Sequence, residues 1–158
     1  MDNKNKSNNE TELLQNILQN TKIEDIDDVF EKNKEILIVP SDDFYNYMKN
    51  KMMEKSLKEV DVFSIAGIDY QYGNKILRGQ RVVKQRDIIL RICLAMQLNF
   101  DETQKAIKLY GLEPLYPKRK RDAIIIVLVG KNEKRRIDIE ELNEELVNRG
   151  ERPLKANG

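Results

Sequence analysis

Hydrophobic residues recur at spacings of three and four through most of the chain, which is the pattern of amphipathic helices. The broadest apolar face falls in residues 84–97 and predicts a central buried helix. Shorter helices are expected at residues 41–55, 56–66, 70–77, 100–111, 117–129 and 138–149. Residues 36–39, before Pro40, are expected to be extended, and no second strand is available to pair with them. The pattern therefore predicts an all-α protein.

Several helix ends can be assigned from their capping residues. In a capping box, a polar side chain accepts from the backbone N–H three residues later, and a Glu there reaches back. Four segments have this pattern: Thr21–Glu24, Ser56–Glu59, Asn99–Glu102 and Asp138–Glu141. Asp69 is expected to cap a helix that begins at Tyr70, and Gly67 is expected to end the preceding helix in a left-handed conformation. A tight turn thus separates two short helices.

Residues 1–40 are expected to form an N-terminal arm outside the main domain. Residues 1–10 are rich in Asn, Lys and Ser and are expected to be disordered. Residues 11–35 place apolar side chains at helical spacing, which predicts two weak helices. These helices either dock on the main body or serve as a partner-binding arm.

Charge is distributed unevenly along the 158 residues. Residues 1–60 hold 9 basic and 13 acidic side chains, a net charge of −4. Residues 61–121 hold 12 basic and 6 acidic side chains (+6), and residues 122–158 hold 7 and 8 (−1). The positive excess therefore falls on the segment with the two short helices, as a surface that binds nucleic acid requires.

The residue types present exclude several classes of chemistry. Cys93 is the only cysteine and there is no His, so neither a disulfide framework nor a Cys/His zinc site can form. Cys93 lies in an apolar stripe and is expected to be a core thiol, because no His is present to activate it. The paired carboxylates Asp27–Asp28 and Asp42–Asp43 fall at helix starts, where the helix dipole accounts for them. We therefore expect no enzyme, no cofactor and no metal site.

The chain carries no pattern typical of export or of membrane insertion. Its first ten residues are polar and lack the apolar region of a secretory signal. The longest apolar run, Ala123–Val129, is far too short to span a bilayer. Together with the single Cys, these features favour a reduced, cytoplasmic location and no membrane partner.

Residues Ser56–Arg81 resemble the helix-turn-helix of the λ-repressor/Cro-like (XRE-type) family. The residues that match the family pattern are Val62, Ala66, Gly67, Ile68, Asp69, Ile76 and Gly79. Leu115–Pro117 and Arg121–Ala123 further resemble a bacterial subgroup with a C-terminal helical extension. The resemblance implies four regions: an N-terminal arm (1–40), a five-helix helix-turn-helix domain (41–113), a C-terminal helical extension (114–153) and a tail (154–158).

Two positions depart from that family pattern. The fifth position of the motif is usually small, but here it is Phe63, and the fifteenth is usually branched and apolar, but here it is Gly73. The two positions face each other in such domains, so the exchange conserves volume, which cores tolerate. We therefore expect the Phe63 ring to cover Gly73.

The resemblance implies a sequence-specific, DNA-binding transcriptional regulator that lays the helix after the turn in the major groove of double-stranded DNA. The side chains expected to contact bases are Tyr70, Gln71, Asn74 and Lys75. Those expected to contact phosphates are Arg78, Arg81, Lys84 and Arg86.

An alternative function stays open at this stage. Helix-turn-helix domains are also used as protein-binding modules, such as antitoxins, adaptors or phage-type inhibitors. A protein partner would then bind residues 11–35 or the C-terminal helix. That helix can instead pair with its copy in a homodimer, or pack on the apolar segment 123–129, which we favour.

Overall fold

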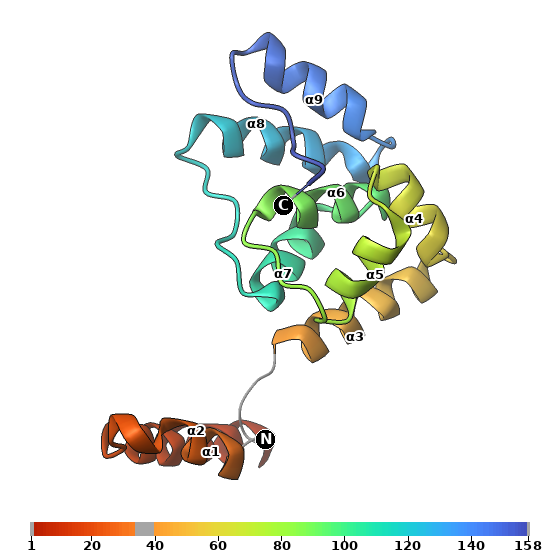
Figure 1. Cartoon of the computed structure of the whole chain (residues 1–158). Coiled ribbons are helices and arrows are strands. Elements are labelled where there is room, and N and C mark those ends of the chain that lie inside the picture. The colour runs from red at the N-terminus through yellow and green to blue at the C-terminus, as the bar shows by residue number, and fades with distance from the viewer. Residues whose placement is uncertain (1, 34–39, 158) are drawn as a thin grey trace. The chain divides into compact units, whose positions relative to one another are not determined.

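The computed structural model describes residues 2–33 and 40–157, and every regular element in them is helical. The expected all-α class is therefore confirmed for this part of the chain. The chain divides into two compact units, Met1–Val39 and Pro40–Gly158 (Figure 1). The extended run expected at residues 36–39 lies outside the described residues.

The N-terminal unit contains α1 (Asp2–Gln19), a short 3-10 helix (Ile23–Asp25) and α2 (Ile26–Lys32). The expected disorder of residues 1–10 was wrong for residues 2–10, because α1 continues through them and no Gly or Pro interrupts it. The capping box expected at Thr21 was also wrong. The Thr21 hydroxyl donates to the carbonyl of Ile17 at 2.7 Å, so it closes α1 and caps no following helix.

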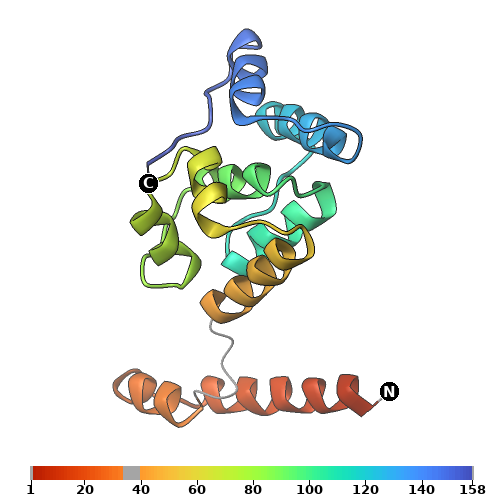
Figure 2. The same cartoon turned by 90° about the vertical axis from the view of Figure 1, so that its right-hand side faces the viewer.

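The larger unit is a bundle of seven α-helices and one short 3-10 helix within residues 40–157. They are α3 (Pro40–Glu54), α4 (Glu59–Ala66), α5 (Tyr70–Leu77), α6 (Arg86–Ala95), α7 (Phe100–Tyr110), α8 (Lys120–Val129), the 3-10 helix Gly130–Glu133 and α9 (Ile139–Asn148). As predicted, α6 is central: seven of its ten residues are buried, and it packs on α4, α7 and α9. Figures 1 and 2 show α8 and α9 together at one end of this unit and α3 at the other.

The helix ends around α4 and α5 follow the sequence in part. Gly67 ends α4 with a left-handed φ of 68°, and the Asp69 side chain accepts from the backbone N–H of Tyr72, as expected. The capping box at Asn99 and Glu102 is also present. The one expected at Ser56 was wrong, because α4 begins only at Glu59 and has no side-chain cap.

The predicted contact between Phe63 and Gly73 is confirmed. Phe63 on α4 is fully buried. A Cβ atom added to Gly73 on α5 would lie 2.5 Å from the Cδ1 atom of the Phe63 ring. The Tyr70 ring lies edge-on to the Phe63 ring, with 6.0 Å between the centroids. The absence of a side chain at position 73 therefore lets the two helices pack across a phenyl ring.

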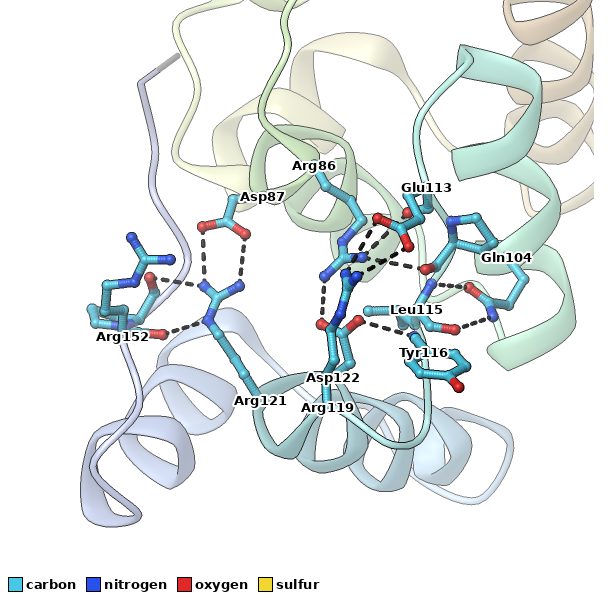
Figure 3. A network of polar contacts seen from close by, with 12 residues as sticks. Arg86, Asp87, Gln104, Glu113, Leu115, Tyr116, Arg119, Arg121, Asp122 and Arg152 are labelled. Carbon is cyan, nitrogen blue, oxygen red and sulfur yellow. Dashed lines mark hydrogen bonds and ion pairs between the residues drawn. The ribbon is translucent and has the colours of Figure 1, made fainter.

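Two ion pairs join the first turn of α6 to the first turn of α8 (Figure 3). Arg86 pairs with Asp122, whose side chain is only 3% exposed, and Asp87 accepts from both terminal nitrogens of Arg121 at 3.0 Å. Each helix contributes a consecutive Arg-Asp dipeptide, and the Arg of each dipeptide binds the Asp of the other. The two pairs are therefore reciprocal. They position α8, on which α9 packs as favoured from the sequence.

The expected tail at residues 154–158 is ordered in its described part, 154–157, and packs on the bundle. Leu154 is buried, and its N–H donates to the Asn143 side chain at 2.7 Å. Arg91 on α6 donates to the carbonyls of Leu154 at 2.7 Å and Lys155 at 2.9 Å, and also to that of Ala66 at the end of α4. The position of this segment depends on partners that are distant in the sequence, Arg91 and Asn143, so no local pattern predicts it.

None of the helices in residues 2–33 and 40–157 combines the length and apolarity needed to cross a membrane.

The Phe63 contact leads to a prediction about Gly73. Helix propensity alone would make Gly73→Ala stabilising by about 1 kcal/mol. We expect it instead to lower the free energy of unfolding by about 1–3 kcal/mol, because the added methyl meets a buried ring. Urea denaturation measures the change. Gly130→Ala is the control, since Gly130 ends α8 with helical φ and ψ and open space around it. Equal effects of the two substitutions would contradict the contact.

The reciprocal ion pairs lead to a second prediction. Asp122→Ala leaves the Arg86 guanidinium without its carboxylate in a largely buried position, so we expect a loss of about 3–5 kcal/mol in the free energy of unfolding. Glu113→Ala removes the partner of Arg119 in an exposed ion pair and is expected to cost less than about 1 kcal/mol. Chemical denaturation of both variants tests the difference. Similar losses in the free energy of unfolding would show that burial does not determine the cost of removing the carboxylate.

Candidate functional site

Helix α5 has one buried face and one polar, accessible face. Gly73, Ile76 and Leu77 are buried against the bundle, whereas Tyr70, Gln71 and Lys75 are exposed. All four side chains expected to contact bases line one open hollow of about 300 Å³, together with Gln80: Tyr70, Gln71, Asn74 and Lys75. The structure therefore brings the predicted base-contacting residues together on one surface.

A carboxylate that the sequence did not single out as a functional residue lies beside this hollow. Glu59 is the first residue of α4, and its side chain is 11% exposed. It accepts from Lys49 on α3 at 2.8 Å and from both terminal nitrogens of Arg78 at 3.1 and 3.3 Å. It also accepts from the Asn74 amide nitrogen at 3.1 Å. Glu59 thus links three helices and holds two of the predicted site residues.

The sequence carried only an indirect signal for this role. The sequence pattern predicts a capping box with Glu59 as its last member, which requires the Glu59 carboxylate to reach back to Ser56. In the structure Ser56 lies beyond the end of α3 with a left-handed φ of 56°, and its N–H donates to the carbonyl of Met53. The carboxylate is therefore available to Lys49, Asn74 and Arg78, which come from other parts of the chain.

The surroundings of Glu59 keep it ionised at neutral pH. Burial by itself would raise the pKa of this carboxyl group, but the hydrogen bonds and charges of Lys49 and Arg78 outweigh burial and lower the pKa below its ordinary value. With one carboxylate between two cations, the cluster carries a net charge of +1. It therefore does not repel an approaching polyanion.

The four residues expected to contact phosphates separate into two groups. Arg81 and Lys84 are exposed, and the Arg81 guanidinium lies 5.3 Å from the centroid of the Tyr72 ring. Arg78 also keeps a third of its side chain exposed while it binds Glu59. Arg86 is different, because its guanidinium binds Asp122 and the carbonyls of Glu113 and Pro114 (Figure 3). It serves the joint between α6 and α8, so it has no part in the interface that we propose below.

Other reactive groups in the described residues do not form a second site. Cys93 is fully buried, and burial raises the pKa of its thiol, which keeps it protonated. No group of three or more His, Cys, Asp or Glu side chains in the described part of the chain is arranged to hold a metal ion.

Comparisons with protein-family models, with curated proteins and with solved structures found no match to this chain.

The lowered pKa of Glu59 predicts how stability depends on pH. A carboxyl group with a lowered folded-state pKa stabilises the protein above its unfolded-state pKa of about 4.3, and this stabilisation is lost as the pH falls through the folded-state value. Glu59→Gln is therefore expected to be less stable than the parent at pH 7, with a gap that narrows below about pH 4. Thermal unfolding at several pH values measures the gap, with Glu113→Gln at an exposed site as control. A gap independent of pH would contradict the ionised cluster.

Proposed function

We propose that the protein is a sequence-specific DNA-binding transcriptional regulator and that α5 enters the major groove of double-stranded DNA. The observation that carries the proposal is the two-sided character of α5. Its apolar face packs on Phe63 and the core, while its amide, lysine and tyrosine side chains open on one hollow. A helix held in this way can present base-reading groups without losing its packing.

The arrangement of α4 and α5 supports this proposal. The two helices pack together across the Gly67–Asp69 turn, with a left-handed glycine at its start and an aspartate cap at its end. This agrees with the helix-turn-helix of the λ-repressor/Cro-like family, whose five helices would correspond to α3–α7. In that geometry the second helix of the pair is the one that enters the groove.

The side chains on α5 suit the edges of bases. The Gln71 amide can accept from adenine N6 and donate to N7, and Lys75 can donate to guanine O6 and N7. Tyr70 is half exposed and can contact a thymine methyl group or a phosphate. These three side chains provide a combination of donors, acceptors and apolar surface.

Basic residues on both sides of α5 suit the phosphate backbone. The helix is followed by three of them, Arg78, Arg81 and Lys84. Lys49 on α3 lies close to α5 because it binds the same carboxylate, Glu59, as Arg78. Each phosphate neutralised steepens the dependence of log K on log salt by about 0.9. The affinity is therefore expected to fall steeply as salt rises.

One observation favours the alternative of a protein-binding module. Several large apolar side chains of the N-terminal unit are exposed: Leu13, Leu18, Ile23, Ile26 and Phe30. Exposed apolar residues at helical spacing are typical of a surface that a protein partner or a second copy covers. A partner at residues 11–35 is compatible with DNA binding by α5, whereas a pure protein binder would not respond to changes on α5.

Selection from a random-sequence duplex library tests the proposal. The purified full chain is expected to enrich a short shared sequence, and its affinity is expected to fall with salt. Gln71→Ala is expected to reduce discrimination between the selected site and single-base variants by about 1–3 kcal/mol at one position, because one base-edge contact is lost. Folding should be unchanged, since Gln71 is exposed.

Gln15→Ala is the matched control, because Gln15 is an exposed glutamine on α1, remote from α5 in sequence. Binding is measured by fluorescence anisotropy at one fixed salt concentration. No enriched sequence, or equal discrimination by both variants and the parent, would contradict base reading by α5.

A further inference from the structure

Both N–H groups of the Asn74 amide on α5 have partners on the protein. A side-chain amide has two N–H donors and one carbonyl acceptor. The Asn74 nitrogen donates to Glu59 Oε2 at 3.1 Å, and a longer contact of 3.5 Å joins its second N–H group to the Tyr70 hydroxyl. No described residue donates to the Asn74 Oδ1 atom. Among the described residues this oxygen is therefore the group of the amide without a partner, and it is the group best placed to bind a base.

The orientation of this amide follows from chemistry. An ionised carboxylate only accepts hydrogen bonds, so the nitrogen of Asn74 must face Glu59. The reverse orientation would bring the amide oxygen against Glu59 Oε2, and two acceptors would repel each other. Glu59 cannot easily turn away, because Lys49 and Arg78 bind its two oxygens.

The direction of the Asn74 contact matters for specificity. A free Asn side chain reads adenine with two hydrogen bonds, accepting from N6 and donating to N7. An amide whose nitrogen is engaged cannot donate to N7. It can accept from the N6 amino group of adenine or from the N4 amino group of cytosine, and guanine and thymine offer no such donor in the major groove.

We propose that Glu59 is a specificity-determining residue that makes Asn74 an acceptor-only reader, so that the base facing Asn74 is adenine or cytosine and never guanine or thymine. The proposal rests on the function proposed above, and it adds which bases are accepted at one position of the DNA site. It differs from the sequence-based expectation for Asn74, in which the amide pairs with adenine through both of its groups. Glu59 acts through Asn74 and does not itself touch the DNA.

Binding-site selection with four full-length proteins, the parent and three variants, tests the proposal. Asn74→Ala identifies the position that Asn74 faces, as the one whose preference is lost. The parent is expected to accept adenine and cytosine there within a few-fold of each other. Glu59→Ala frees the amide to bind adenine through N6 and N7, so adenine is expected to gain about tenfold or more over cytosine. Glu113→Ala removes an exposed carboxylate elsewhere and is expected to leave the preference unchanged.

The outcomes separate the two proposals. A parent that prefers guanine or thymine at that position, or an adenine-to-cytosine ratio unchanged by Glu59→Ala, overturns the role of Glu59 while DNA binding stands. The same holds if Asn74→Ala changes no position. A parent that enriches no sequence overturns the proposed function and the inference with it. Circular dichroism confirms folding, and Glu59→Met, which keeps the length of the side chain but has no oxygen to accept from Asn74, replaces Glu59→Ala if that variant unfolds.

Discussion

The reciprocal ion pairs between the first turns of α6 and α8 determine how the C-terminal half of the bundle is attached. Arg86 with Asp122 and Asp87 with Arg121 hold α8 at the start of the central helix. Helix α9 packs on α8, and the segment after α9 returns to α6, where Arg91 binds its carbonyls. Because Arg91 also binds the carbonyl of Ala66, this attachment continues to the turn before α5.

Glu59 and Phe63 both help to position α5, by different physical means. Phe63 packs on the backbone of Gly73 and determines how closely α5 approaches α4. Glu59, one turn earlier on α4, binds the side chains of Asn74 and Arg78 and determines which polar groups α5 presents. Packing therefore positions the helix backbone, and a shared carboxylate orients its side chains. Both contacts start from α4, so a shift of α4 would move the polar face of α5 as well.

Periodicity and capping residues predicted most of the fold, because these signals are local. The central helix, the turn at Gly67–Asp69 and the capping box at Asn99 all depend on residues within a few positions of one another. Two of the errors came from competition between distant groups. Glu59 bonds to Lys49, Asn74 and Arg78 instead of capping α4, and Arg86 bonds to Asp122 instead of lying free for phosphate. No local pattern shows which distant partner a charged side chain will find.

The contact between Phe63 and Gly73 also restricts the order in which these two positions can change during evolution. A side chain gained first at position 73 would enter space that the ring already fills. A shorter side chain gained first at position 63 would leave a void that a later residue at position 73 can occupy. The accessible path therefore begins at position 63. Homologues are expected to carry a large residue with glycine, or a small residue with a branched one, and the effect of either substitution depends on the other.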